Sequence, residues 1–309
     1  MVALPPSRGS GQTIDIIGVP MEWGAGRAGV RLGPSALRSA TLAQNLTALG
    51  YSVRDRGDVD VVVVDDEPDD SSPRPHHVDA IRRACAQLAD VVQGSLNDSA
   101  FPVVIGGDHS LAIGVLAGVA RTKGPQGVIW IDAHADMNTP RTSPSGNVHG
   151  MAMAIALGEV PDLFPPPDFP APSVDASRCV FVGLRDVDPG ERRLIRERGI
   201  VCLTMSDIDR HGMAAVMDRA IAVAGSGPGS AHISLDIDSL DPQTAPGTGT
   251  PVRGGLTYRE AHLAMELIAD SRIAHSLELT EVNPQLDESK MTAMVAMELI
   301  CSAMGKVIL

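Results

Sequence analysis

Three side chains that can bind metal ions alternate at the end of one apolar segment. Asp132, His134 and Asp136 follow the run Gly127–Ile131, at positions i, i+2 and i+4. Because side chains on an extended backbone alternate between two faces, this spacing points all three the same way. One aspartate here would be an ordinary turn residue, but three alternating ligands predict a metal site. If the run is a parallel strand, they occupy its carboxyl end, where open α/β sheets bind ligands.

Two other segments repeat the arrangement. Asp236 and Asp238 end the run His232–Ile237, and His109 follows a pair of glycines after another apolar run. The glycines allow a sharp turn and a close backbone approach. Alone, His109 would be expected to be a buried core histidine, but the three segments together favour a ligand. Four aspartates and two histidines meeting in one place would be intolerable without cations.

The ligand types indicate which metals would bind. No thiolate is among them, which argues against structural zinc, and carboxylates with some imidazole suit Mn²⁺ or related divalent ions. Six ligands are too many for one catalytic metal with an open position, but they suit two metals that share carboxylates. Such sites hold ions roughly 3.5–4 Å apart around a bridging hydroxide that acts as nucleophile. The residues alone therefore predict metal-assisted hydrolysis.

Short β-branched runs alternate with helical patterns along the chain, which predicts a parallel sheet covered on both faces. The predicted strands are Thr13–Val19, Pro102–Ile105, Gly127–Ile131, Cys179–Gly183, Ile200–Leu203, His232–Ile237 and Ser276–Leu279. The predicted helices are Ser35–Leu49, Val78–Val92, Leu111–Ala120, Glu191–Glu197, Met213–Ala224, Tyr258–Ile268 and Lys290–Met304.

The pattern keeps one character throughout, so a single domain over residues 1–309 is favoured, with residues 1–12 as a flexible N-terminal segment. Asp65–His77 and Pro161–Ser173 are rich in proline and aspartate, which predicts surface loops. The spacing Gly24-Ala-Gly26-Arg-Ala-Gly29 matches a dinucleotide motif, but that motif must join a strand directly to a helix. Here Pro20–Trp23 intervenes and the next helix begins near Pro34, so we interpret it as a flexible loop.

The composition excludes several classes of protein. The net charge of −13 and a pI near 5.0 make a nucleic-acid partner unfavourable, because phosphate binding needs basic patches. The four cysteines form no C-x-x-C pair, which is typical of reduced thiols in a cytosol. The N-terminus lacks the apolar core of a signal peptide, and no stretch reaches membrane-spanning length. We expect a cytoplasmic protein with no membrane partner.

The motifs GGDHS, DAHAD and SLDIDSLDP, in this order, resemble those of the ureohydrolase (arginase/agmatinase) family, and of bacterial arginases in particular. The resemblance covers nearly the whole chain. It implies a three-layer α/β/α fold of one domain with a central, mostly parallel, eight-stranded sheet, and a homotrimer or homohexamer. It also implies two Mn²⁺ ions per subunit. One ion would be held by His109, Asp132, Asp136 and Asp236, and the other by His134, Asp132, Asp236 and Asp238, with Asp132 and Asp236 bridging.

The resemblance also points to L-arginine as the substrate, hydrolysed to L-ornithine and urea by the metal-bridging hydroxide. The segment 143–150, SPSGNVHG, resembles the arginase loop that recognises the α-carboxylate and α-amino group, which agmatine hydrolases typically lack. Asp188 would face the substrate ammonium and Glu281 the guanidinium. The implied substrate-binding residues are His134, Asn138, Ser143, Ser145, Asn147, Asp188, Glu191, Thr250 and Glu281.

The catalytic roles carried over fall to three residues. His149 would protonate the departing amine, since the pKa of histidine lies near neutrality. Asp136 would hold the proton of the hydroxide, and Glu281 would position the guanidinium. Alternatives are another guanidino substrate (N-hydroxyarginine, agmatine or a guanidino acid) and a catalytically silent relative. Two positions depart from common bacterial arginases: Ala152 stands where proline is frequent, and Ser239 where glycine is usual.

Overall fold

The computed structural model describes residues 11–62, 75–227 and 230–307, and a single eight-stranded sheet runs through them. Its order is β2-β1-β3-β8-β7-β4-β5-β6, and every pairing between neighbouring strands is parallel. The strands are β1 Thr13–Val19, β2 Ser52–Asp58, β3 Phe101–Gly106, β4 Gln126–Ile131, β5 Val174–Val182, β6 Val201–Leu203, β7 Ala231–Asp236 and β8 Ala274–Thr280.

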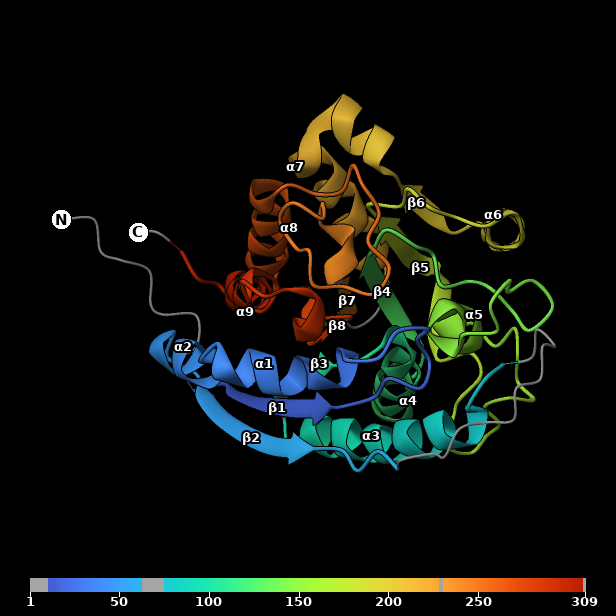
Figure 1. Cartoon of the computed structure of the whole chain (residues 1–309), viewed down its shortest axis with the longest axis horizontal. Coiled ribbons are helices and arrows are strands. Elements are labelled where there is room, and N and C mark those ends of the chain that lie inside the picture. The colour runs from blue at the N-terminus through green and yellow to red at the C-terminus, as the bar shows by residue number, and fades with distance from the viewer. Residues whose placement is uncertain (1–10, 63–74, 228–229, 308–309) are drawn as a thin grey trace.

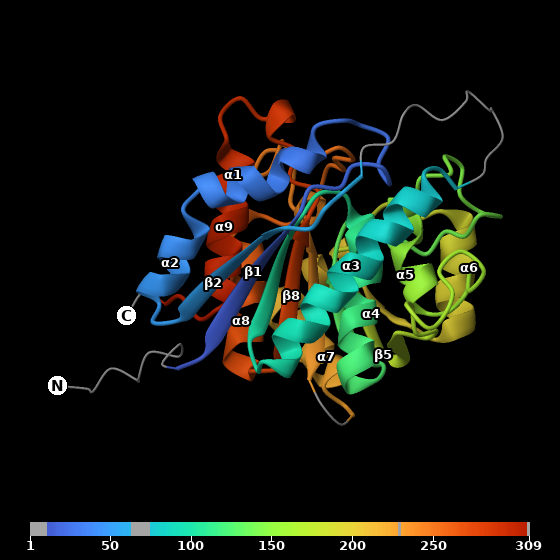
Figure 2. The same ribbon diagram turned by 90° about the horizontal axis from the view of Figure 1, so that it is seen from below.

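Helices cover both faces of the sheet, as the alternating pattern predicts (Figures 1 and 2). On one face lie α1 (Gly33–Ser39), α2 (Leu42–Ala48), α7 (Met205–Ala224), α8 (Tyr258–Ser271) and α9 (Met291–Ala303). On the other lie α3 (Val78–Asn97), α4 (Ala112–Lys123), α5 (Ala152–Ala156) and α6 (Pro189–Arg198). Each face has its own buried apolar cluster. The predicted three-layer α/β/α architecture is confirmed.

The central strands β3, β4, β7 and β8 are buried on both faces, because helices cover both. The strands β3 and β4 carry apolar side chains on both faces, whereas β7 and β8 carry polar side chains on one face. In β4 and β7 every residue is buried, and β3 is buried throughout. This explains why β3 and β4 are continuous apolar runs in the sequence. The predicted ligands lie at or directly after the ends of β3, β4 and β7.

Several elements differ from the prediction: the short helix α5 was not predicted, β5 begins earlier and α3 ends later than expected, and three further differences have local causes. The strand β2 was missed because it is a polar edge strand, and its exposed Arg54, Asp55, Arg56 and Asp58 hide the apolar signal. The predicted helix Ser35–Leu49 is two helices, since Thr41 has a left-handed backbone (φ 62°). The predicted helix Met213–Ala224 begins earlier, at Met205, and bends at Gly212.

The predicted loops can be compared with the structure in part. Pro161–Ser173 forms turns and bends. Of Asp65–His77, residues 65–74 lie outside the described residues, as do residues 1–10 of the predicted N-terminal segment. Within the described ranges, no helix combines the length and apolarity needed to traverse a bilayer.

The close packing of α3 on α4 generates a first prediction. Gly94 in α3 faces open space, whereas a Cβ on Gly118 in α4 would lie 2.6 Å from the carbonyl oxygen of Ala89. We expect Gly94→Ala to raise the free energy of unfolding by about 0.5–1 kcal/mol, because alanine favours a helix over glycine. Gly118→Ala should lower it by about 1–3 kcal/mol through overpacking.

Urea denaturation of the two variants beside the parent chain measures both effects. The two substitutions are matched in chemistry and differ in their surroundings. If Gly118→Ala stabilises the chain as much as Gly94→Ala does, the close approach of the two helices is incorrect.

Candidate active site

The predicted ligands lie at the carboxyl ends of neighbouring central strands. The register of β4 against β7 pairs Ile131 with Leu235, so Asp132 and Asp236 are the next residues on two adjacent strands. His109 follows β3 and opens a short 3₁₀ turn, His109–Leu111. Asp238 lies in another short turn, Ile237–Ser239, directly after β7. The sheet order thus brings segments that are far apart in sequence to one edge.

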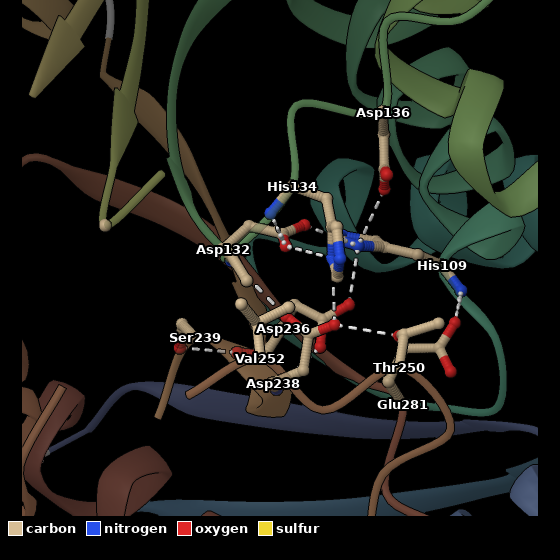
Figure 3. Close-up of polar contacts among 12 residues, drawn as sticks. His109, Asp132, His134, Asp136, Asp236, Asp238, Ser239, Thr250, Val252 and Glu281 are labelled. Carbon is tan, nitrogen blue, oxygen red and sulfur yellow. Dashed lines mark hydrogen bonds and ion pairs between the residues drawn. The ribbon is translucent and has the colours of Figure 1, made fainter. Parts of the chain in front are cut away.

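The six predicted ligands point toward one another (Figure 3). His109 Nδ1 lies 3.2 Å from an oxygen of Asp132, 3.1 Å from Asp136 and 3.0 Å from Asp236. Around the second imidazole, His134 Nδ1 lies 3.0 Å from Asp238 and 3.5 Å from Asp132.

These contacts form two overlapping sets of ligand atoms. One set contains His109, Asp132 and Asp236, and the other contains Asp132, His134 and Asp238. Asp132 belongs to both and offers a different oxygen to each imidazole. A carboxylate shared in this way is the arrangement that a two-metal site requires.

The donor atoms fit divalent cations. His109 Nδ1 is buried and has no hydrogen-bond partner among the described residues, although it faces three carboxylates. A buried nitrogen lone pair beside carboxylate oxygens is unfavourable unless a proton or a metal ion lies between them. Oxygen donors with two imidazoles and no thiolate match the preference of Mn²⁺ and similar ions.

The pKa values show how strongly the cluster attracts positive charge. Burial alone would lower the pKa of His134, but its contacts with Asp132 and Asp238 outweigh burial and raise that pKa to about 12. The pKa of His109 is also raised, because its contacts with the carboxylates around it outweigh burial. Burial and the charge of Asp132 raise the pKa of Asp238 to about 6. In the metal-free chain, histidine protons therefore supply part of the charge that cations would supply.

Other side chains hold the cluster in place, and the sequence did not single them out. The Trp130 indole N–H donates to Asp132 over 2.9 Å, and its ring stacks on the His109 imidazole with 4.1 Å between centroids. The Arg185 guanidinium donates to the carbonyl oxygens of Asp238 (2.6 Å) and Ser239 (3.1 Å). Trp130 lies beside the DAHAD motif, and Arg185 lies in the segment 183–190, GLRDVDPG, which also contains Asp188. Closeness to these segments in the sequence was the signal that could have found both residues.

Two of the predicted catalytic residues have unusual backbones. Asp136 (φ 50°) and Glu281 (φ 63°) both lie in the left-handed region, which few residues other than glycine adopt. Such conformations cluster at functional sites, where the surrounding structure maintains them. Here they turn both carboxylates toward the cluster end of the sheet.

The buried Glu281 and the half-buried His149 form an ion pair at the mouth of the cluster. His149 Nδ1 lies 3.0 Å from Glu281 Oε1, which also accepts the backbone N–H of His109 over 2.9 Å. Burial works against both charged forms, but the pairing outweighs it. The pKa of His149 is raised to about 9, and that of Glu281 is lowered.

The glycine-rich segment 24–29 is a wall of this pocket. The Gly24 N–H donates to Asp108 over 2.9 Å, and the Gly24 carbonyl accepts the N–H of His149 over 3.2 Å. Asn283 donates to the carbonyl oxygen of Ala28. These bonds tie the segment to three parts of the site, which the interpretation as a flexible loop did not anticipate. Asp108, in the GGDHS motif, is a third residue that the sequence reasoning missed, after Trp130 and Arg185.

Two connected cavities open onto the cluster. One, of about 320 Å³, is lined by His134, Asp136, Asp236, Asp238, the predicted proton donor His149 and the predicted head-group residues Asn138, Ser143, Ser145, Asn147, Asp188, Glu191 and Thr250. The other, of about 500 Å³, is lined by residues that include Arg27, His134, His149, Thr250 and Glu281. The structure therefore brings every predicted site residue except His109 and Asp132, which lie deeper, to a cavity wall.

Some of the predicted head-group residues also hold the pocket together. Glu191 accepts the N–H of Met137 (2.9 Å) and that of Asp188 (2.8 Å), so it joins the strand-end loop to the start of α6. Burial raises its pKa to about 7. Asn138 donates to Asp188 over 2.8 Å, and Thr250 donates to Asp238 over 2.9 Å. The head-group side chains are thus oriented before any ligand arrives.

Known proteins are similar to this chain in sequence and in fold. Residues 12–305 match the arginase family. The chain belongs to that family. The arginase of Bacillus caldovelox is 46% identical over 293 residues, which cover 95% of this chain and 98% of that protein. The arginase of Brevibacillus brevis is 45% identical over 303 residues, which cover 95% of this chain and 98% of that protein. The native structure of the Bacillus caldovelox arginase matches with a TM-score of 0.91 and 45% identity, over 96% of this chain and 100% of the other.

The two departures from common bacterial members of the arginase family are accommodated locally. The Ser239 hydroxyl donates to the carbonyl oxygen of Asp236 over 2.6 Å, so this buried polar group is satisfied. Ala152 is the first residue of α5, a position at which proline is also tolerated. Neither substitution removes a predicted ligand.

The ion pair generates a second prediction. In metal-free protein, we expect NMR titration to give His149 a pKa of about 9. Glu281→Gln should shift it toward about 6.5, the ordinary histidine value, because the acceptor charge is lost. Because the folded-state pKa of His149 is raised, its stabilisation is full below about pH 6.5 and is lost as pH rises through the folded-state value.

Glu288→Gln is the matched control, because it removes an exposed carboxylate that is close to Glu281 in sequence. It should leave the titration of His149 unchanged. A His149 pKa near 6.5 in the parent chain would show that the pair does not form.

Proposed function

We propose that this protein is an arginase that hydrolyses L-arginine to L-ornithine and urea at a pair of Mn²⁺ ions. The observation that carries the proposal is the carboxylate–imidazole cluster at the base of a cavity. The rim of this cavity holds Glu281 and the segment 143–150, which we call the head-group segment because it is expected to bind the α-carboxylate and α-amino group. The relatives named above are called arginases, and they match this chain at 45–46% identity over nearly its whole length. The substrate is therefore a small cation, and the acidic cavity attracts it.

The residues that would hold the ions are divided as the family resemblance implies. His109, Asp132, Asp136 and Asp236 would hold one ion, and His134, Asp132, Asp236 and Asp238 would hold the other. The spacing of the ligand atoms around His109 and His134 supports this division. Two ions held by these residues would lower the pKa of a bound water, which would supply a nucleophile at neutral pH.

The chain itself positions the guanidinium and manages its protons. Glu281 offers a carboxylate that can accept two parallel N–H bonds from a guanidinium. This contact replaces the one that His149 makes with Glu281 in the free chain. Asp136, whose pKa is raised by burial and by the charge of Asp132, takes the proton of the attacking water.

His149 then supplies a proton to the departing amine. Addition of water to the guanidinium carbon gives a tetrahedral centre, and cleavage of its bond to the side-chain nitrogen releases ornithine and urea. The leaving nitrogen needs a proton, and His149 can bring one to the reaction, because its pKa is raised to about 9 while it pairs with Glu281 in the free chain.

The head-group residues select an amino acid over a simple amine. Short polar side chains at 138, 143, 145, 147 and 250 suit an α-carboxylate and α-ammonium, partly through ordered water. Asp188 supplies a negative charge for the ammonium. A different guanidino substrate remains the alternative function, and a substrate panel separates the two.

The main test is a matrix of metals and substrates. Metal-free protein loaded with Mn²⁺ should release urea from L-arginine, and exhaustive chelation should abolish the activity. Asp238→Ala should nearly abolish turnover, because it removes a charged contact of His134 at the cluster. Asp209→Ala, an exposed aspartate in α7, should behave as the parent does. Full activity after chelation would defeat the two-metal proposal.

The head-group segment gives a separate prediction. Asn147 is half-buried and lines both cavities. We expect Asn147→Ala to lower kcat/KM for L-arginine roughly 10-fold or more, the effect of one lost hydrogen bond to a charged group, with little change for agmatine.

Asn97→Ala, at the exposed end of α3, is the matched control for this substitution. Agmatine preferred over L-arginine by the parent enzyme would contradict the assignment of the head-group segment.

A further inference from the structure

A chain of buried polar side chains runs from His109 into the sheet, away from the cavity. His109 Nε2 lies 2.8 Å from the Ser234 hydroxyl, which donates to Glu278 Oε1 over 2.8 Å. Ser234 and Glu278 are fully buried, on β7 and β8. The register pairs these two residues directly across the strands.

The direction of these bonds determines which nitrogen of His109 carries a proton. A serine hydroxyl has one hydrogen, and here it is given to the Glu278 carboxylate. Ser234 must then accept at its oxygen, so His109 Nε2 donates an N–H. The proton required at Nε2 leaves Nδ1 free to use its lone pair, and Nδ1 is the atom that faces Asp132, Asp136 and Asp236.

Two further polar residues, His232 and Ser276, extend this chain beyond Glu278. His232 Nε2 lies 3.5 Å from Glu278 Oε1, and His232 Nδ1 bonds the hydroxyl of Ser276 over 2.8 Å. The Ser276 hydroxyl also contacts His275 Nδ1 over 2.7 Å. A buried carboxylate is retained only where such partners offset its desolvation. Both partners of Glu278 lie at Oε1, and its Oε2 has no hydrogen-bond partner among the described residues.

We propose that Glu278 is a positioning residue for the predicted metal ligand His109, acting through Ser234. The inference rests on the proposed two-metal function. Glu278 fixes the His109 ring so that Nδ1 is the metal-binding nitrogen. The negative charge of Glu278, 3.8 Å from His109 Nε2, makes Nδ1 a stronger electron-pair donor to the metal. His232 holds the carboxylate in place. The effect is confined to the metal site that contains His109.

The decisive variant is Glu278→Gln, which keeps the volume of the side chain and removes its charge. An amide N–H can also donate to Ser234, which would turn the serine hydroxyl toward His109 and require the proton on Nδ1. We expect the affinity for one of the two Mn²⁺ ions to fall roughly 10–100-fold, as measured by calorimetric titration of metal-free protein. The affinity for the other ion, at His134, should be unchanged.

A double-mutant cycle tests whether the effect passes through Ser234. Ser234→Ala should weaken the same ion, and the double variant Ser234→Ala/Glu278→Gln should be no weaker than Ser234→Ala alone. Electron paramagnetic resonance offers a second readout. At limiting Mn²⁺ the spectrum of a magnetically coupled pair should give way, in Glu278→Gln, to that of an isolated ion.

Asp15→Asn is the matched control, because Asp15 is another fully buried carboxylate, on β1 and paired with Arg54. It should cost stability and leave both metal affinities unchanged. Parent-like affinities in Glu278→Gln, or full additivity in the double variant, would overturn the positioning role while leaving the proposed function intact. A parent chain that binds no Mn²⁺ would overturn both.

Discussion

The accumulation of negative charge at the ends of four adjacent parallel strands is the constraint on which the rest of this structure depends. The carboxylates of Asp132, Asp236 and Asp238 are almost fully buried and lie around two imidazoles. Like charges removed from water repel strongly, so the arrangement persists only with protons or cations among them. The raised pKa values of the histidines are the metal-free expression of this requirement.

The site has a rigid floor and an assembled rim. Its floor consists of strand ends, whose positions follow from the register of β4, β7 and β8. Its rim is made of loops that bond to one another: Gly24 to His149, Glu191 to Met137, and the ring of His76 to the carbonyl oxygen of Ser145. The predicted metal ligands on the floor and the predicted head-group residues on the rim can therefore differ in how far they move.

Local patterns in the sequence predicted what depends on local spacing. The continuous apolar runs indicated a doubly covered sheet. The alternation in DAHAD indicated three converging side chains, but its premise of an extended backbone is wrong, since the strand ends at Ile131 and the chain bends after it. The missed features depend on spacing across strands or on polar surfaces. Nothing local pairs Ser234 with Glu278, and nothing local places segment 24–29 against His149. The polar strand β2 lacks the apolar signal that strand prediction requires.

The order of the strands has a consequence for how the molecule is made. Strands β7 and β8, from the C-terminal third of the chain, lie between β3 and β4, which precede them in sequence. The contact of His109 with Glu281 spans 172 residues. On the ribosome, β3 and β4 are therefore synthesised long before the strands that separate them. The predicted ligands can therefore come together only after the C-terminal third of the chain has been made, and until then β3 and β4 lack the strands that pair with them in the folded protein.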